Sequence, residues 1–331
     1  MNGSRSRSWK GGIVNLRKPV LVRLIETEYS FGMNVADADE LRRALLNSSG
    51  VESAYCGKTR ARLLGGLLKL RSRFSPRNNG IVQGKVTYFS VLMAGVGLSR
   101  SPQFLFAKNR AVYLFDCWPE HRESICRYLS EAGVQDVMIN SQRFVSEIES
   151  MGLNLRAHYV PEAVDTEAYS VLPFERKDID VIEFGRKHPD YHRKICASLE
   201  SNDRKHHYEI INSRDAFVEK LARSKVSICF PRTMTTPGLN PEFEFFTMRY
   251  LQSIASNCLV VGRAPADLIK LFGYNPVIEA DLEYPEEQME AILDNYDTYR
   301  DLIERNRNTL CASHTWQHRA ADILAILAEN R

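Results

Sequence analysis

Short apolar runs alternate with stretches of helical spacing along nearly the whole chain. In the first half, apolar runs predict strands at 20–25, 88–95, 111–116 and 136–140. Apolar residues at a period of 3.6 predict helices at 37–46, 102–107, 122–132 and 141–151. The second half repeats the scheme, with strands expected at 179–184, 208–212, 226–231, 259–262 and 276–278 and helices at 213–223, 243–254, 265–272, 285–295, 296–308 and 315–329. Strands that alternate with helices predict parallel sheets covered by helices on both faces.

The length of the chain favours two domains, because a single hydrophobic core stops growing at about 250–300 residues and this chain has 331. We predict an α/β protein of two doubly wound, Rossmann-like domains that face each other across a cleft. The expected divisions are a disordered lead-in at 1–12, a first domain at 13–165, a second domain at 166–312 and a final helix at 313–331. Open parallel sheets bind ligands at the carboxyl ends of their strands, so the cleft is the expected ligand site.

The composition is that of a globular protein, with 44% apolar and 26% charged residues. A net charge of only +3 does not indicate a general nucleic-acid binder. The seven cysteines form no C-x-x-C pair and stand mostly in apolar runs, which favours buried reduced thiols over a disulfide framework or a zinc site. The polar, basic segment 1–12 is unlike a secretory signal, and no apolar run reaches the length of a membrane span. We therefore expect a cytoplasmic protein.

The segment 226–262 carries the densest set of candidate residues, in a predicted strand, polar loop, helix, tight turn and strand. Glu244 is expected at the start of that helix, where unpaired backbone N–H groups and the helix dipole also favour a phosphate. Gln252 is expected two turns later on the same face. Arg249, between them, is a cation that can pair with phosphate or with acids.

This segment resembles glycosyltransferases of the two-domain GT-B type, within the group-1 glycosyl transferases and especially their spore-maturation-protein-like branch. Those proteins carry two Glu residues separated by seven others, with an Arg three positions before the second. Glu244, Arg249 and Gln252 occupy these positions, so Gln stands in place of the second Glu. Asn257 replaces a Gly after the helix, and the residues at 245–247 replace a glycine-rich turn.

Three further segments carry the same resemblance. Val-Pro-Glu-Ala-Val-Asp at 160–165 resembles the start of the family's second domain, and Asp-Val-Ile-Glu-Phe-Gly-Arg-Lys at 180–187 resembles its first strand and the Gly-Arg that reaches the donor phosphates. His-Thr-Trp at 314–316 resembles the opening of the last helix, which in the family crosses back to the first domain. The resemblance spans residues 159–327, and the first domain matches in architecture alone.

The resemblance implies a hexosyltransferase-like glycosyltransferase that moves a sugar from a nucleoside-diphosphate sugar to an unknown acceptor. The donor-binding residues that it implies are Gly185, Arg186, Lys187, Thr247, Arg249 and Gln252. Glu244 is the implied catalytic acid, and Asp116 and His121 are first-domain catalytic candidates because they follow a predicted strand; a strand-end acid can equally be a structural cap. We expect no cofactor or metal, since cations and helix N–H groups would stabilise the leaving diphosphate, and the resemblance favours retention of configuration.

The same residues are also compatible with other functions. Gln252 in place of Glu leaves a catalytically degenerate nucleotide-sugar-binding or scaffold protein as an alternative, and a nucleotide-sugar epimerase shares the two-domain architecture. The D-x-D patterns at 178–180 and 37–39 lead into a strand and open a helix, so they do not predict a metal site. The Gly-x-Gly at 95–97 lacks the third glycine of a dinucleotide fingerprint, because position 100 is Arg100.

The segment Lys58–Phe74 is basic, contains no acid and is compatible with an amphipathic helix. On such a helix Leu63, Leu64, Leu67 and Leu68 share one side, and Lys58, Arg62, Lys69 and Arg73 share the other. One hypothesis is peripheral contact with the anionic inner face of a membrane or with a lipid-diphosphate acceptor; the alternative is a domain helix whose leucines pack on a sheet. The segment lacks interleaved aromatic residues, so no specific nucleic acid is expected.

Overall fold

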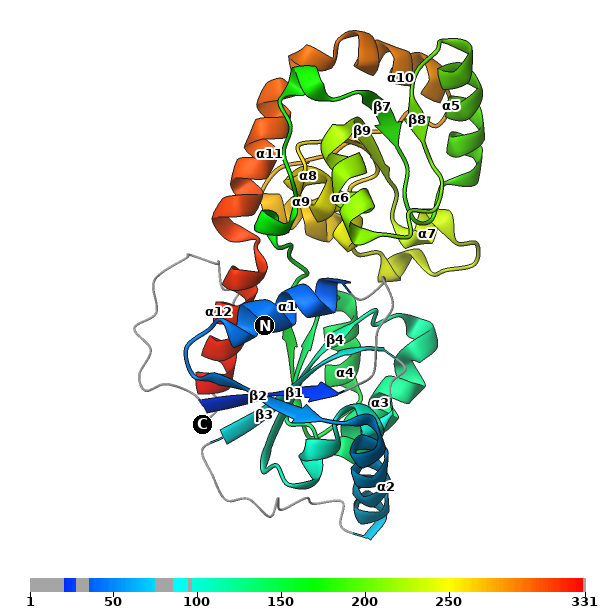
Figure 1. The fold of residues 1–331 in the computed structure, drawn as a ribbon. Helices are drawn as coiled ribbons and strands as arrows, with labels where there is room; N and C mark the ends of the chain where they lie inside the picture. The colour runs from blue at the N-terminus through cyan, green and yellow to red at the C-terminus, as the bar shows by residue number, and fades with distance from the viewer. Residues whose placement is uncertain (1–20, 28–35, 75–85, 95–96, 330–331) are drawn as a thin grey trace, which may run out of the picture.

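The computed structural model describes residues 21–27, 36–74, 86–94 and 97–329, so the predicted lead-in at 1–12 lies outside the described residues. The described chain forms two lobes, each built on one sheet with helices packed around it (Figure 1). Every pair of neighbouring strands in both sheets is parallel. The predicted α/β class with two doubly wound, Rossmann-like sheets is therefore confirmed.

The first lobe contains six strands in the order β2-β1-β3-β4-β5-β6. The strands are β1 (Leu21–Thr27), β2 (Val51–Cys56), β3 (Val86–Met93), β4 (Asn109–Phe115), β5 (Asp136–Ile139) and β6 (Arg156–Tyr159). The helices of this lobe are α1 (Ala36–Leu46), α2 (Lys58–Phe74), α3 (Arg122–Ala132) and α4 (Gln142–Ser150). Strand β4 is buried on both faces, as expected of a central parallel strand made of a continuous apolar run.

The second lobe contains five strands in the order β11-β10-β9-β7-β8. The strands are β7 (Ile179–Ile182), β8 (His206–His207), β9 (Ser224–Cys229), β10 (Leu259–Gly262) and β11 (Ile278–Glu279). The helices are α5 (Pro189–Ser201), α6 (Arg214–Arg223), α7 (Arg232–Thr235), α8 (Met248–Ala255), α9 (Ala266–Phe272), α10 (Pro285–Asp294) and α11 (Arg300–Ser313).

Both sheets follow the same winding rule. In each, the first strand lies inside the sheet, the second strand is added on one side and the third on the other. The winding direction therefore reverses between β1 and β3 in the first lobe and between β7 and β9 in the second. Loops diverge at such switch points and leave a crevice at the carboxyl ends of the strands, which is where ligands of open α/β sheets bind.

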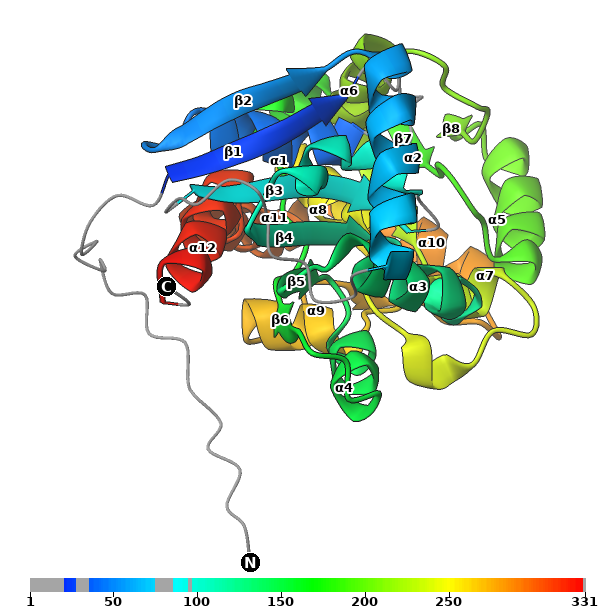
Figure 2. The same cartoon turned by 90° about the horizontal axis from the view of Figure 1, so that it is seen from below.

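The chain crosses between the lobes twice, and the two crossings run side by side. Val164 and Thr315 form an isolated parallel bridge between the segment that leaves the first sheet and the segment that precedes helix α12 (Trp316–Glu329). Helix α12 packs against α1 in the lower lobe, as seen in Figure 1 and, from below, in Figure 2. Fully buried Trp316 contacts the rings of Tyr113 and Phe115 on β4. The last helix thus crosses back to the first lobe.

Two predicted elements in the second lobe are wrong. The strand expected at 208–212 is absent, and edge strand β8 is confined to the two residues before it. The helix expected from 243 begins only at Met248, after a 3-10 turn at Pro241–Phe243 and an extended stretch. The carboxylate of Asp267 accepts the backbone N–H of Phe246 at 3.2 Å, which holds that stretch out of the helix.

The remaining differences concern elements that the apolar pattern did not predict or assigned to another type. Strands β2 and β6 and helix α5 were not expected from the apolar pattern, and the helix expected at 102–107 is a 3-10 helix at Pro102–Leu105. Within the described ranges, no helix combines the length and apolarity that crossing a membrane requires.

Candidate active site between the two sheets

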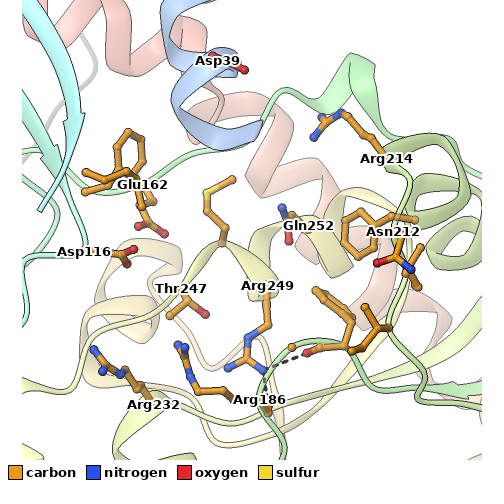
Figure 3. Close-up of a pocket in the computed structure, with 18 of the residues that line it drawn as sticks. Asp39, Asp116, Glu162, Arg186, Asn212, Arg214, Arg232, Thr247, Arg249 and Gln252 are labelled. Atoms are coloured by element: carbon orange, nitrogen blue, oxygen red, sulfur yellow. Dashed lines mark hydrogen bonds between the residues drawn. The ribbon is translucent and has the colours of Figure 1, made fainter. Parts of the chain in front are cut away.

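A cavity of about 1580 Å³ lies between the lobes at the carboxyl ends of both sheets (Figure 3). Eight of the nine sequence-predicted site residues line it: Asp116, His121, Gly185, Arg186, Lys187, Thr247, Arg249 and Gln252. Most of them converge because they follow a parallel strand or lie at the start of a helix on the same edge of a sheet, and Gln252 lies one turn farther along α8. Glu244, the ninth, is not among the described residues that line the cavity.

The loops after β7 and β9 form the second-domain wall, at the switch point of that sheet. Arg249, on the first turn of α8, donates hydrogen bonds to the backbone carbonyls of Phe184 (3.2 Å), Arg186 (2.7 Å) and Phe230 (3.0 Å), two of which Figure 3 marks. Gly185 has φ of +72°, which a glycine adopts without strain, and its backbone passes against the Arg249 side chain. Arg249 therefore fastens the two loops to each other and to α8.

Positive charge is concentrated on this wall. Burial in the cavity wall, and then the neighbouring guanidinium groups of Arg249 and Arg232, lower the pKa of Arg186. Arg232 was not predicted as a site residue; it directly follows the loop after β9, pairs with Glu120 at 2.6 Å and lies 4.4 Å from the centre of the Trp118 ring. Guanidinium groups that repel one another favour an anion between them, and a diphosphate supplies two charged groups.

The N-terminus of helix α8 also opens onto the cavity. Thr247, Met248 and Arg249 line it, and the N-cap Thr247 makes no side-chain capping bond. The Oγ1 atom of Thr247 is buried and has no hydrogen-bond partner among the described residues. Backbone N–H groups at a helix start bind anions readily, so this end of α8 extends the anion-binding wall. Gln252 lies farther along the same helix and is buried.

Glu244 lies in the extended stretch before α8, so the expectation that it begins the helix and shares a face with Gln252 is wrong. Its carboxylate accepts a hydrogen bond from the Thr233 hydroxyl at 3.0 Å and the residue is half-buried. Burial, with a further contribution from the charge of Glu244, raises the pKa of the neighbouring Asp267 to about 7. Glu244 thus belongs to the network that shapes the 244–247 stretch.

The first domain contributes acids and aromatic rings. Asp116 follows β4 with φ of +53°, a left-handed conformation that Asp tolerates better than most residues, and its side chain is exposed to the cavity. Trp118 donates from Nε1 to the Asp116 carboxylate at 3.4 Å and stacks on Phe245 of the second domain, with ring centres 4.2 Å apart. His121 lines the same wall. The site is therefore assembled from both domains.

Glu162 is a second acid on this side and, unlike Asp116, it is buried; the sequence did not single it out although it belongs to the motif at 160–165. It is 5% exposed, lines the cavity and accepts a hydrogen bond from the Asn140 amide at 2.6 Å. Figure 3 shows its carboxylate beside that of Asp116, across the cavity from Arg186 and Arg232. These two acids thus face the arginines of the second-domain wall, and Arg42 and Arg43 on α1 also line the cavity.

One buried ion pair joins the domains at the edge of the cavity. Glu40 on α1 pairs with Arg214 at the start of α6, and its carboxylate also accepts the backbone N–H of Asp165 at 2.8 Å. Burial raises the pKa of Glu40. These contacts connect the first lobe, the second lobe and a crossing segment, so they fix the present separation of the two walls.

Comparisons with known proteins agree with this geometry. Residues 175–325 match the family model described as "Glycosyl transferase-like". The N-terminal domain of trehalose-6-phosphate phosphatase from Candida albicans superposes with a TM-score of 0.58 and 9% identity, covering 96% of this chain and 98% of that one. HepE of Anabaena, solved in complex with UDP, superposes with a TM-score of 0.55 and 11% identity, covering 93% and 99%. No curated protein matches the sequence significantly.

The structural likeness, at these identities, shows the fold: the chain has the two-domain GT-B architecture. The family match covers most of the second lobe, which therefore resembles a glycosyl transferase-like domain.

Proposed function

We propose that this protein transfers a sugar from a nucleoside-diphosphate sugar to an acceptor held by the first domain. The observation that carries the proposal is the basic wall of the cavity at the β7–β9 switch point, where Arg249 holds the loops by hydrogen bonds to their backbone carbonyls. This wall lies within the domain that matches the glycosyl transferase-like family model. HepE of Anabaena, which shares the fold, has also been solved in complex with UDP-glucose (TM-score 0.51, 11% identity, 93% of this chain and 98% of that one). UDP is accordingly the first nucleotide to test.

In the proposed complex, the donor diphosphate lies against Arg186, Arg232 and the N-terminus of α8. Gln252 accepts from or donates to the ribose hydroxyls. The diphosphate gains charge as the glycosidic bond breaks, and fixed guanidinium and N–H groups stabilise that charge without reorganising. We propose that these groups make a bound metal unnecessary for departure of the diphosphate.

The acceptor approaches from the opposite wall. Asp116 and Glu162 place carboxylates beside each other there, and Asp116, being exposed to the cavity, is the proposed group that orients the acceptor hydroxyl. Closure of the lobes would exclude water and limit hydrolysis of the donor. The resemblance to retaining enzymes favours retention, which NMR of the anomeric proton in the product distinguishes from inversion.

The screen that tests donor binding is thermal shift with UDP, GDP, ADP, TDP and CMP, each with and without magnesium. A bound nucleotide stabilises the folded protein by an amount that grows with the logarithm of its concentration relative to Kd. We expect one nucleoside diphosphate to raise Tm without metal and Arg186→Ala to abolish the shift, whereas Arg193→Ala, an exposed arginine on α5 paired with Asp190, keeps it. No shift with any nucleotide at millimolar concentration would remove the transferase proposal.

We also propose that α2 contacts an anionic membrane surface, which would make the protein peripheral at the inner face. Leu64 is partly buried and Leu68 is fully buried, so the predicted cluster of four leucines is divided. The exposed side chains instead form one stripe at helical spacing: Leu63, Leu67, Leu70 and Phe74, the first 67% and the last 82% exposed. Exposed apolar stripes on a basic helix are typical of interfacial helices.

Liposome co-sedimentation tests this contact. Leu63→Ser with Phe74→Ser is expected to release the protein from vesicles rich in phosphatidylglycerol, and Leu282→Ser, an exposed leucine of the second lobe, is expected not to. Wild-type protein that remains in the supernatant at low salt contradicts the proposal.

A further inference from the structure

Four side chains with metal-binding chemistry meet in the second lobe, away from the cavity. Glu183 directly follows β7, His192 and Cys196 lie one turn apart on α5, and His206 is on β8. Each side chain offers one ligand atom, and these four atoms all lie within 4.8 Å of one another. None of the four is among the described residues that line the cavity, so the cluster is separate from the proposed donor site.

Individual separations in the cluster are close to the edges of a coordination tetrahedron, but His206 faces Cys196 with Nδ1 and Glu183 with Nε2, and only one of these nitrogens can bind the ion. Bond lengths of about 2.0 Å to N or O and 2.3 Å to S place tetrahedral ligands roughly 3.3–3.6 Å apart. Cys196 Sγ lies 3.5 Å from His192 Nδ1 and 3.6 Å from His206 Nδ1, and His206 Nε2 lies 3.2 Å from Glu183 Oε2. His192 Nδ1 contacts the same Glu183 oxygen. Small torsional adjustments would place one atom of each residue around a common centre.

One polar atom of the cluster, Nε2 of His206, is not satisfied by the others. His206 has a 6% exposed side chain, and its Nε2 forms no hydrogen bond among the described residues despite its approach to Glu183. Glu183 is 3% exposed at its side chain. A buried imidazole nitrogen that faces a carboxylate without a hydrogen bond is an arrangement that a cation completes.

We propose that Glu183, His192, Cys196 and His206 bind one Zn²⁺ ion in a structural site. The sulfur and two imidazole nitrogens favour a borderline-soft cation over Mg²⁺ or Ca²⁺, which require oxygen ligands. Binding transfers the Cys196 thiol proton to solvent, and one thiolate with one carboxylate then balances the two positive charges of the ion. Four protein ligands leave no open position, as expected of a site that stabilises structure.

The zinc site would stabilise the loop after β7, which forms part of the proposed donor-binding wall. Glu183 precedes Phe184 and Gly185 in the chain, so fixing its carboxylate fixes the start of the loop after β7. The ring of Tyr208 packs on both histidines, with ring centres 5.3 and 5.0 Å away, and its carbonyl accepts from Lys187 Nζ at 2.7 Å. This inference replaces the sequence-based expectation that none of the cysteines binds a metal.

Cobalt substitution tests the ligand set independently of enzymatic activity. The full chain is stripped with a chelator, titrated with Co²⁺ and then with Zn²⁺, and the bound zinc is counted by mass spectrometry of the metal. Cys196→Ser and His206→Gln remove ligands, and Cys311→Ser on α11, outside the cluster, is the matched control.

We expect one zinc per chain, and a thiolate-to-cobalt charge-transfer band that Zn²⁺ displaces. Cys196→Ser should lose this band and His206→Gln should bind Zn²⁺ at least about 10-fold more weakly, while Cys311→Ser matches the wild type. Absence of the band from the wild-type protein, or its persistence in Cys196→Ser, would overturn the proposal, and the first of these results does not depend on the folding of any variant.

Discussion

The two walls of the cavity are built differently. In the second-domain wall, basic side chains are hydrogen-bonded to backbone carbonyls of the same domain. Arg249 donates to three of them, and Lys187 donates to the Tyr208 carbonyl. The first-domain wall presents Asp116 and His121 from the chain after β4, where, among the residues that the structure describes, the exposed carboxylate of Asp116 accepts one hydrogen bond, from Trp118 at 3.4 Å. One wall is preorganised for a constant chemical group, and the other is open.

This difference suits a transferase. Every nucleoside-diphosphate donor carries the same diphosphate, so fixed cations and N–H groups can serve it without adjustment. Acceptors vary, and loops on a rigid scaffold are where specificity changes most easily. The predictions that follow each alter one wall and ask whether the other keeps its properties.

The largest effect is expected from the open wall. Asp116→Asn preserves a residue that tolerates positive φ but removes the charge that orients the acceptor. We expect kcat for transfer to fall by about 100- to 10,000-fold with nucleotide affinity unchanged, measured by release of nucleoside diphosphate and by calorimetry. Asp190→Asn, an exposed acid on α5, is the control. Transfer within two-fold of wild type would remove Asp116 from the mechanism.

On the fastened wall, Asp267 should make stability depend on pH. Its folded pKa of about 7 exceeds the ordinary Asp value of 3.8, so the folded state binds more protons between these values and the free energy of unfolding falls as pH rises from about 4 to 7. The decrease is at most about 4 kcal/mol. Asp267→Asn can still accept the Phe246 N–H through Oδ1, but it should not show this decrease. The measurement compares the free energy of urea unfolding at pH 5 and pH 8 for the two proteins. Parallel profiles for the two proteins would contradict this assignment.

Arg249→Met tests whether the hydrogen bonds of Arg249 hold the loops after β7 and β9 in place. Three backbone carbonyls lose a charged donor, which should lower the free energy of unfolding by about 2–4 kcal/mol and abolish nucleotide binding. Arg263→Met removes only an exposed pair with Glu279 and should cost less than about 1 kcal/mol. Equal losses for the two variants in urea denaturation would show that Arg249 does not fix the wall.

A smaller effect is expected at Gly185. A Cβ there would stand 3.3 Å from Arg249 Cδ in a backbone with φ of +72°, so Gly185→Ala should cost about 1–2 kcal/mol and weaken nucleotide binding. Gly238→Ala has a similar φ of +80° and nothing within 4 Å of the added Cβ. The difference between the two variants in thermal unfolding isolates the contact with Arg249. If both unfold alike, the contact carries no constraint.

The sequence predicted the three central strands of the second domain, β7, β9 and β10, because each contains apolar residues that mark a buried strand without knowledge of its neighbours. The strand at 259–262, for example, has the bounds that were expected. The predicted site residues converge for a related reason, since the ends of parallel strands share one edge. The resemblance supplied their proposed roles, which the apolar pattern alone could not.

The errors arose where tertiary contacts outweigh local pattern. Acids and apolar residues at 242–246 imitate a first helical turn, yet stacking of Phe245 on Trp118 and the bond from Phe246 to Asp267 keep that stretch extended. Arg232 and Glu162 carry no local signal, because their importance comes from the opposite domain. The metal-binding cluster combines three elements, and only the spacing of His192 and Cys196 could have suggested it.

Calorimetric titration of UDP tests the central claim, that the fastened wall binds the donor, most directly. We predict that wild type and His121→Ala bind UDP with affinities within about three-fold of each other, and that Arg186→Ala binds about 10- to 100-fold more weakly because it loses one charge-assisted contact worth roughly 1.5–3 kcal/mol. No binding heat in the wild type, or equal affinity in Arg186→Ala, would contradict the account.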